Sequence, residues 1–425
     1  MASAPTSVTL RSYQVGFGDC FLLSFHYGEG EGAEARHVLL DFGTTGLPKK
    51  GLSLVQIAKQ IESACGGKLH AVIATHRHAD HISGFAGESG RIIRDLAPEL
   101  VLQPWTEHPD MPEDAPEIPA HLRGARRFRG MLAQMHQVAE SALREIGQLG
   151  HSLKTTARQL YFLGETNLCN RAAVDALQSL DCPHVYASHG EPSGLEEILP
   201  GVKVRVLGPP TLEQSRAVRK ERREDPAEFW HLQATASEQS AATGMPLFPE
   251  ASQIPFGEYP DNTRWFIPRL ESLRGDQILE IVRLLDEAMN NTSLILLFEV
   301  GKRKLLFPGD AQIESWEHAL KTAGDRDEIR ALLADVDVYK VGHHGSLNAT
   351  PRTLWNLFRK KGDRTRPDRL RTLLSTKAGK HGHKDRGTEV PCKKLEAALQ
   401  EYSTLYSTQS LKSNKSPCHE LRIEV

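Results

Sequence analysis

Three histidines and an aspartate lie within the segment Thr75-His76-Arg77-His78-Ala79-Asp80-His81, directly after the apolar run Ala71-Val72-Ile73-Ala74. If that run is a strand, His76 and His78 point to the same side, because side chains alternate along an extended chain. Imidazole nitrogens and carboxylate oxygens suit divalent zinc, iron or manganese. A surface loop rich in histidine is the alternative, but a His-x-His-x-Asp-His cluster behind an apolar strand favours a metal site.

Acidic or imidazole side chains follow three other predicted strands, each at the start of a turn. They are Asp41, Asp310 and the pair His343-His344. A single aspartate after a strand is commonly a turn former or a helix cap. Four separate segments that place such side chains at strand ends instead indicate a site built from loops on a rigid scaffold.

Hydrophobic periodicity and turn residues predict the elements that position these residues. Apolar runs predict strands at residues 8–11, 20–25, 37–40, 69–74, 202–207, 293–300, 304–307, 336–341, 370–375 and 420–425. Apolar residues at helical spacing predict helices at residues 54–65, 279–289, 313–322 and 392–402. The chain is therefore expected to be α/β, with its candidate ligands at strand ends.

Two long stretches interrupt this order within what is expected to be a single domain over residues 1–425. Residues 89–180 are predicted to form a helical insertion, because apolar residues such as Met131, Met135 and Val138 recur at helical spacing. Residues 211–289 form a second insertion that combines a charged helix with a Pro- and aromatic-rich loop. Loops this long are usually functional or disordered, and the aromatic residues argue against disorder.

Composition excludes several classes of protein. The chain has 425 residues, 39% of them hydrophobic, and a formal net charge of -2, so it can bury a large core and has no overall attraction for nucleic acid. Its six cysteines include no Cys-x-x-Cys pair, which fits neither a disulfide framework nor a thiolate zinc site. Without an apolar run of eighteen residues or an N-terminal signal pattern, the chain is expected to be soluble and cytoplasmic, with no membrane partner.

Several segments together resemble the metallo-β-lactamase-fold hydrolases, and among them the soluble hydrolase domain of the ComEC-type competence proteins. The resemblance implies a four-layer αββα sandwich, here with the two long insertions, and a metal-dependent hydrolase. The matching segments are Gln14–Asp19, Leu39–Gly43, Ala74–His81, Asn290–Ser293, Leu305–Ala311 and Tyr339–Ser346.

The resemblance also implies a set of ligands for two divalent ions, zinc or manganese. The first ion would be held by His76 and His78, the second by Asp80, His81 and His343, and Asp310 would bridge them. His343 is preferred to His344, which would then face the substrate.

Behind these ligands, Asp41 and Asp19 would orient a ligand histidine. Many relatives supply one more histidine from a later loop, where this chain has Asn290-Asn291. The first ion would then have two histidines plus oxygen, a set that favours manganese.

The net charge of the expected two-ion site predicts the type of substrate and the mechanism. Two divalent ions outweigh the charges of Asp80 and Asp310, so the site suits an anionic substrate such as a phosphodiester. A water shared by the ions would become hydroxide and attack, with Asp80 as a catalytic ligand. His344 and His383 are candidates for protonating the leaving oxygen or gripping a phosphate, although His383 is equally well explained as an exposed loop residue.

The expected substrate-binding residues lie in loops that border the metals. They are Lys377, Lys380, Lys384, Ser346 and Asn291. The preferred function is a phosphodiesterase or nuclease acting on DNA, with nucleic acid or another phosphodiester as the partner. The alternatives are hydrolysis of a small ester, such as a lactone, a phosphorylcholine ester or a cyclic nucleotide, and metal binding for regulation without turnover.

Overall fold

The computed structural model describes residues 4–28, 34–108, 171–211, 214–215, 289–346, 350–380, 389–411 and 417–425. The described residues all belong to one compact unit. Among the described helices, none combines the length and the apolar character that crossing a membrane requires.

The first sheet contains seven strands. They span Ser7–Tyr13 (β1), Cys20–Tyr27 (β2), Glu34–Phe42 (β3), Ala71–Ile73 (β4), Leu100–Pro104 (β5), His184–Ala187 (β6) and Cys418–Glu424 (β13). Their order is β13-β1-β2-β3-β4-β5-β6. Strands β13, β1, β2 and β3 are antiparallel neighbours, whereas β3, β4, β5 and β6 run parallel.

The second sheet contains six strands and repeats this mixed pattern. They span Val202–Gly208 (β7), Ile295–Val300 (β8), Arg303–Phe307 (β9), Val338–Lys340 (β10), Arg371–Leu374 (β11) and Thr404–Ser407 (β12). Their order is β12-β11-β10-β9-β8-β7. Strands β7, β8 and β9 are antiparallel neighbours, and β9, β10, β11 and β12 run parallel.

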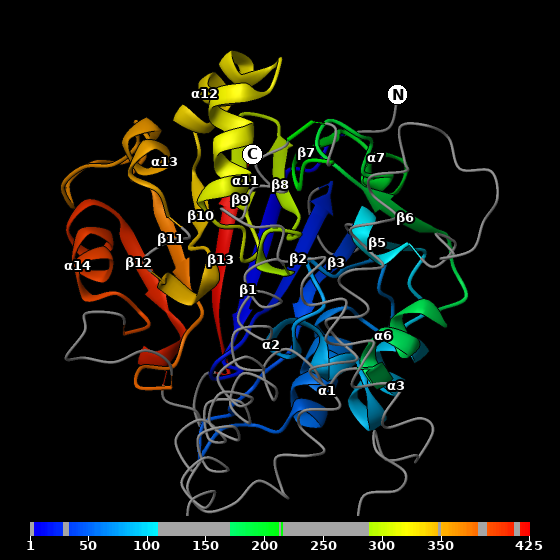
Figure 1. Ribbon diagram of the computed structural model, residues 1–425. Coiled ribbons are helices and arrows are strands. Elements are labelled where there is room, and N and C mark those ends of the chain that lie inside the picture. The colour runs from blue at the N-terminus through cyan, green and yellow to red at the C-terminus, as the bar shows by residue number, and fades with distance from the viewer. Residues whose placement is uncertain are drawn as a thin grey trace, which may run out of the picture. The chain divides into compact units, whose positions relative to one another are not determined.

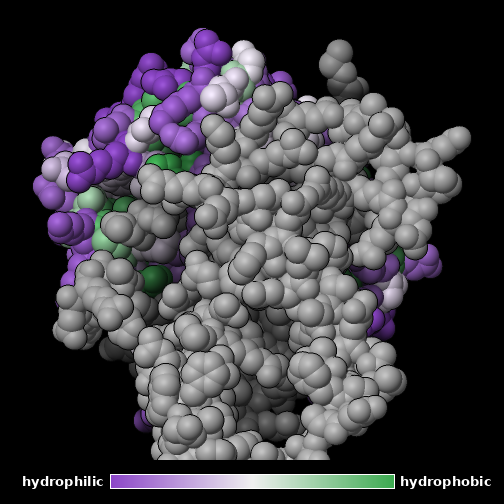
Figure 2. All heavy atoms as spheres, in the orientation of Figure 1, coloured by the Kyte–Doolittle hydropathy of each residue, from purple (hydrophilic) through white to green (hydrophobic). Residues whose placement is uncertain are grey.

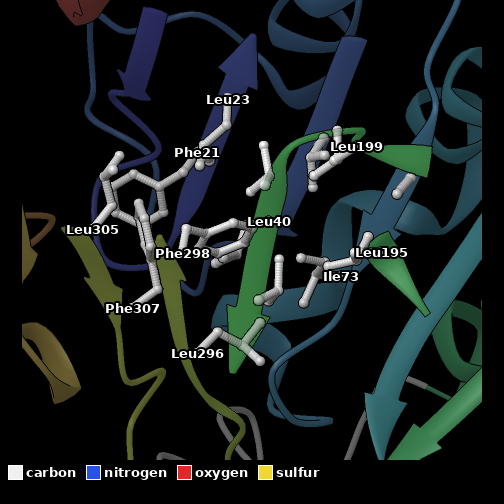
Figure 3. Close-up of a cluster of buried hydrophobic side chains, with 14 of the residues drawn as sticks. Phe21, Leu23, Leu40, Ile73, Leu195, Leu199, Leu296, Phe298, Leu305 and Phe307 are labelled. Carbon is white, nitrogen blue, oxygen red and sulfur yellow. The ribbon is translucent and has the colours of Figure 1, made fainter. Parts of the chain in front are cut away.

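The main core lies between the two sheets. Figure 3 shows Phe21 and Leu40 from the first sheet packed with Phe298 and Phe307 from the second. The rings of Phe21 and Phe307 have centroids 5.8 Å apart in an edge-to-face arrangement, which is a preferred geometry for aromatic pairs. Both sheets bury an apolar face in this core. The core therefore fixes the position of the strand ends of one sheet relative to those of the other.

Helices cover the outer face of each sheet (Figure 1). The described α-helices span Leu54–Ala64 (α1), Ala79–Ile82 (α2), Gly87–Asp95 (α3), Arg171–Gln178 (α6), Leu195–Ile198 (α7), Ile313–Glu317 (α11), Arg326–Ala334 (α12), Arg352–Leu357 (α13) and Lys393–Tyr402 (α14). Helices α1, α3 and α6 pack on the first sheet, and α11 to α14 pack on the second. Figure 2 shows a mainly hydrophilic surface over α12 and α13, as expected for amphipathic helices.

The structure is thus a mixed α/β sandwich with the layers helix, sheet, sheet and helix, in agreement with the α/β class expected from the sequence. One boundary differs from expectation. Residues 89–180 were expected to form a helical insertion, yet Leu100–Pro104 within them is a fully buried strand of the first sheet. Periodicity cannot separate so short an apolar run from a buried helix. Most of the second insertion, 211–289, lies outside the described residues.

Candidate metal centre

The candidate ligands meet where parallel strands of both sheets end. In the first sheet, Asp41 lies at the end of β3, and the segment Thr75–His81 follows β4. In the second sheet, Asp310 follows β9, and the pair His343-His344 follows β10. The carboxyl ends of parallel strands are the usual place for ligands in open α/β sheets. The main chain links the sheets here, because the Leu294 N–H donates to the Thr75 carbonyl over 3.0 Å.

Four buried side chains form one group of possible metal ligands: Asp80, His81, Asp310 and His344. One ligand atom from each lies within 4.8 Å of the others. His344 Nε2 is 3.1 Å from Asp80 Oδ2, and His81 Nε2 is 3.1 Å from Asp310 Oδ2. His344 Nε2 is also 3.5 Å from Asp310 Oδ2, so this oxygen lies between the two rings. The group draws on both sheets and can bind a metal ion.

The donor set fits a divalent ion. Two carboxylates and two imidazoles are ligands that zinc and manganese both accept. The second oxygen of Asp80, Oδ1, is buried and has no hydrogen-bond partner among the described residues. A buried carboxylate oxygen without a partner is costly, and a cation would satisfy it.

Charge interactions dominate the pKa values in this group. Burial by itself lowers the pKa of His81 and His344, but the neighbouring carboxylates, Asp310 foremost, raise both above the ordinary value. Burial raises the pKa of Asp310, yet the charges of His81 and His344 hold it well below the usual range. The pKa of Asp80 is also lowered, against the effect of its burial, by the hydrogen bond to His344. Divalent metal binding at these imidazoles therefore requires release of their protons.

His344, and not the expected His343, belongs to the group. The ring of His344 is fully buried, and its Nδ1–H donates to the Ser375 carbonyl over 3.0 Å, which turns Nε2 toward the carboxylates. The side chain of His343 is 27% exposed, and its Nε2 lies 3.9 Å from Asp310 Oδ2. Both residues have positive φ, 40° for His343 and 50° for His344. This left-handed turn directs the second imidazole inward, which the strand pattern could not indicate.

His76 and His78, which were expected to hold the first ion, lie next to this group. Nε2 of His76 is 3.0 Å from Nδ1 of His78, and the ring of His76 lies 4.1 Å, centroid to centroid, from that of His81. Burial lowers the pKa of His76 well below its ordinary value and that of His78 to about 4. Both rings are therefore neutral near pH 7, the form that binds metal.

A turn with unsatisfied amide groups precedes β8. Asn290 is fully buried, and neither its Oδ1 nor its Nδ2 has a hydrogen-bond partner among the described residues. The Oδ1 of Asn291 is also without one in the described ranges, although its main-chain carbonyl accepts from Ser315 Oγ over 3.0 Å. Buried amides normally have partners, so this turn can offer oxygen ligands.

Asp41 lies directly behind His81. Its Oδ2 is 2.7 Å from His81 Nδ1, and it accepts hydrogen bonds of 2.8 Å from the N–H and the hydroxyl of Thr75. A carboxylate on the outer nitrogen of a ligand histidine fixes the ring and its tautomer. Thr75 had not been singled out from the sequence, although it directly precedes the histidine cluster.

Asp19 and Lys340 form a buried ion pair beside the group. Lys340 Nζ contacts Asp19 Oδ2, lies 3.3 Å from Asp310 Oδ1, and donates to the Gly309 carbonyl over 2.9 Å. Burial lowers the pKa of Lys340, but Asp19 and Asp310 raise it above the ordinary value, so the lysine is charged. The sequence had placed Asp19 behind the ligands, but it had not identified Lys340. The only signal was a lysine within the apolar run of β10.

Close backbone packing holds the loops of the first sheet together. The Asp19 N–H donates to the Asp80 carbonyl over 2.9 Å, and the Gly43 N–H donates to the Asp19 carbonyl over 3.0 Å. A Cβ atom on Gly43 would lie 2.5 Å from backbone atoms of Asp80 and His81. Only glycine permits this approach, so Gly43 lets the loop after β3 support the ligand segment.

The expected substrate-binding residues have varied placements. Lys377 Nζ donates to the carbonyls of Gly46 and Leu47, over 3.1 and 2.9 Å, and the Lys380 side chain packs beside Gly46. Ser346 directly follows the His343–Gly345 turn, and its buried Oγ has no partner among the described residues. His383 and Lys384 lie outside the described residues.

No family model and no curated protein matches this chain.

Proposed function

We propose that this chain is a metal-dependent hydrolase of the metallo-β-lactamase type that cleaves phosphodiesters, most of all DNA. The observation that carries the proposal is the buried group of Asp80, His81, Asp310 and His344, which comes from both sheets. The layered α/β sandwich and the position of the group at the ends of parallel strands support the same proposal.

In this proposal Asp80, His81 and His344 would hold one divalent ion, and Asp310 would be a ligand shared with a second ion. His344 takes the role that the sequence had suggested for His343, because its Nε2 faces both carboxylates.

The second ion, zinc or manganese, would be held by His76 and His78. The buried amides of Asn290 and Asn291 are the proposed source of a further oxygen ligand. Neutral imidazoles and an amide oxygen carry no charge, so this position attracts a cation less strongly than the position that contains the carboxylates.

When bound, divalent ions lower the pKa of water and stabilise negative charge on phosphoryl oxygens. The residues of the chain orient the site: Asp41 holds His81, and the Ser375 carbonyl holds His344. His343, partly exposed above Asp310, can donate a hydrogen bond to a substrate oxygen. Two ions would leave a net positive charge beside the carboxylates, which favours an anionic substrate.

The test is hydrolysis of single- and double-stranded DNA by purified protein loaded with zinc or manganese. We expect cleavage that depends on metal and is abolished by Asp80→Asn. Asp325→Asn, which changes a half-exposed aspartate outside the group, is the matched control and should retain wild-type activity. Absence of cleavage by the wild type, or equal cleavage by Asp80→Asn, would remove the case for a nuclease.

Hydrolysis of a small ester is the second candidate, and one contact favours it. The ammonium of Lys377 is engaged by two loop carbonyls, which makes it less available to a phosphate backbone. Competition by heparin, a long polyanion, separates the candidates. It should inhibit a nuclease strongly and leave hydrolysis of a cyclic nucleotide or lactone nearly unchanged. Bound metal with no turnover of any substrate would instead indicate a regulatory metal site.

A further inference from the structure

Lys340 is a permanent cation inside the candidate metal centre. Its side chain is 1% exposed, and Asp19, its main partner, is fully buried. The ammonium forms an ion pair with Asp19 and donates hydrogen bonds to Asp310 Oδ1 and to the Gly309 carbonyl. An ordinary buried ion pair is rarely worth more to folding than apolar side chains of the same volume. Its position against a candidate ligand therefore suggests a role in the centre.

The two carboxylate oxygens of Asp310 have different partners, and Lys340 contacts only one of them. Oδ1 faces Lys340 at 3.3 Å, whereas Oδ2 faces His81 at 3.1 Å and His344 at 3.5 Å. While the ammonium stays in place, only Oδ2 is free to face a metal ion. Asp310 is therefore restricted to one metal-facing oxygen.

The same ammonium also occupies a second group of buried ligands. Asp19, Asp41 and His81 have ligand atoms within 4.8 Å of one another and are all buried, so by composition they can bind a cation. Lys340 contacts Asp19 in this group, while His81 Nδ1 lies 2.7 Å from Asp41. A divalent ion at this position would have to displace the ammonium.

We propose that Lys340 is a positioning residue that acts as the built-in cation of the centre: it limits Asp310 to one metal-facing oxygen and keeps divalent ions away from Asp19. The inference rests on the proposed function only in assuming that the Asp80 group binds metal. It predicts that the lysine lowers metal affinity, because its removal frees two carboxylate oxygens and deletes a nearby positive charge.

The test compares Lys340→Met, which keeps most of the side-chain volume without the charge, with the wild type. Zinc and manganese dissociation constants are measured by competition with a chelating dye, and melting temperatures with and without metal. We expect metal to bind at least about tenfold more tightly to the variant. Metal should also raise the melting temperature of the variant more than that of the wild type. Without metal, the variant has no cation beside the buried carboxylates of Asp19 and Asp310, whereas the wild type has Lys340. The increase in affinity should be greater for manganese than for zinc, because manganese prefers oxygen ligands.

Lys360→Met is the matched control. Lys360 is also largely buried and ion-paired, 2.8 Å from Asp337, but it contacts none of the candidate ligands in the described part of the chain. Its substitution should lower the melting temperature equally with and without metal and leave the dissociation constants unchanged.

Adding Asp19→Asn to Lys340→Met keeps the test decisive if the single variant folds poorly. The double variant removes both members of the pair, so it should fold and return metal affinity toward the wild-type value. Unchanged or weaker metal binding by Lys340→Met, or equal binding by the single and double variants, would overturn the role of Lys340. If the wild type itself binds no metal, the proposed function fails as well.

Discussion

The candidate centre contains two sets of side chains, which differ in charge and in the hydrogen bonds that hold the candidate ligands in place. Asp80, His81, Asp310 and His344 contain two carboxylates and are held from behind by charged or hydrogen-bonding groups. His76 and His78, by contrast, are neutral and contact each other at 3.0 Å, and the oxygen ligands proposed for them are uncharged amides. We refer to these sets as the acidic half and the histidine half.

This difference shows how a fold can make two similar positions unequal. Ligands that are held by outer partners need little reorganisation when an ion binds, and such partners raise affinity by one to two orders of magnitude. Carboxylates add direct attraction for a cation. The acidic half is therefore expected to bind its ion first and more tightly.

Asp310→Asn should have the largest effect, because the carboxylate faces both imidazoles of the acidic half and contacts Lys340. We expect hydrolysis to fall by roughly a hundredfold or more and metal content to drop in both halves. Plasma mass spectrometry of the dialysed protein, with hydrolysis rates, checks this. Retention of two ions per chain by Asp310→Asn would show that the acidic half does not depend on this residue.

The adjacent histidines should behave differently when each is replaced by glutamine. His344→Gln removes a ring that lies 3.1 Å from Asp80, so metal affinity of the acidic half should fall by about a hundredfold. His343→Gln should leave metal content unchanged and lower turnover by about tenfold or more, since only its substrate-facing hydrogen bond is lost. The reverse result would restore His343 as the ligand.

Asp41→Asn tests the support of the acidic half without touching its ligand atoms. The amide can still accept from Thr75, but it loses the charge beside His81 Nδ1. Metal affinity should fall by about ten- to a hundredfold, measured by dye competition. An unchanged dissociation constant would mean that the contact of Asp41 with His81 does not contribute to the difference in metal affinity between the two halves.

The smallest effect on the acidic half is expected from His76→Gln. This change should remove the ion of the histidine half and leave the affinity of the acidic half within about tenfold, although the rings of His76 and His81 are neighbours. The measurement is metal content together with titration of the remaining site. Loss of both ions would show that the halves bind metal as one unit.

Much of the site could be predicted because its signals are local in the chain. The cluster His76–His81, together with Asp41 and Asp310, directly follows short apolar runs that the structure contains as β4, β3 and β9. Strand periodicity depends only on neighbouring residues, and parallel strands bring their carboxyl ends to one edge. The α/β class and the position of these residues at strand ends therefore followed from spacing alone.

The remaining features depend on contacts between distant segments. The choice of His344 over His343 arises from two left-handed residues and from the Ser375 carbonyl, 31 residues further along the chain. Likewise, Lys377 was expected at the substrate but contacts the loop at Gly46 and Leu47. Neither a backbone handedness nor a carbonyl partner can be read from residue type.

The sequence by itself determined which side chains could bind metal and that strands would present them. Only the tertiary structure decided which of these side chains contact one another. The two sheets must pack before Asp80 meets His344 and before Lys340 lies between Asp19 and Asp310. Burial then makes these few charge contacts strong, since the low dielectric of the interior weakens electrostatic interactions far less than water does.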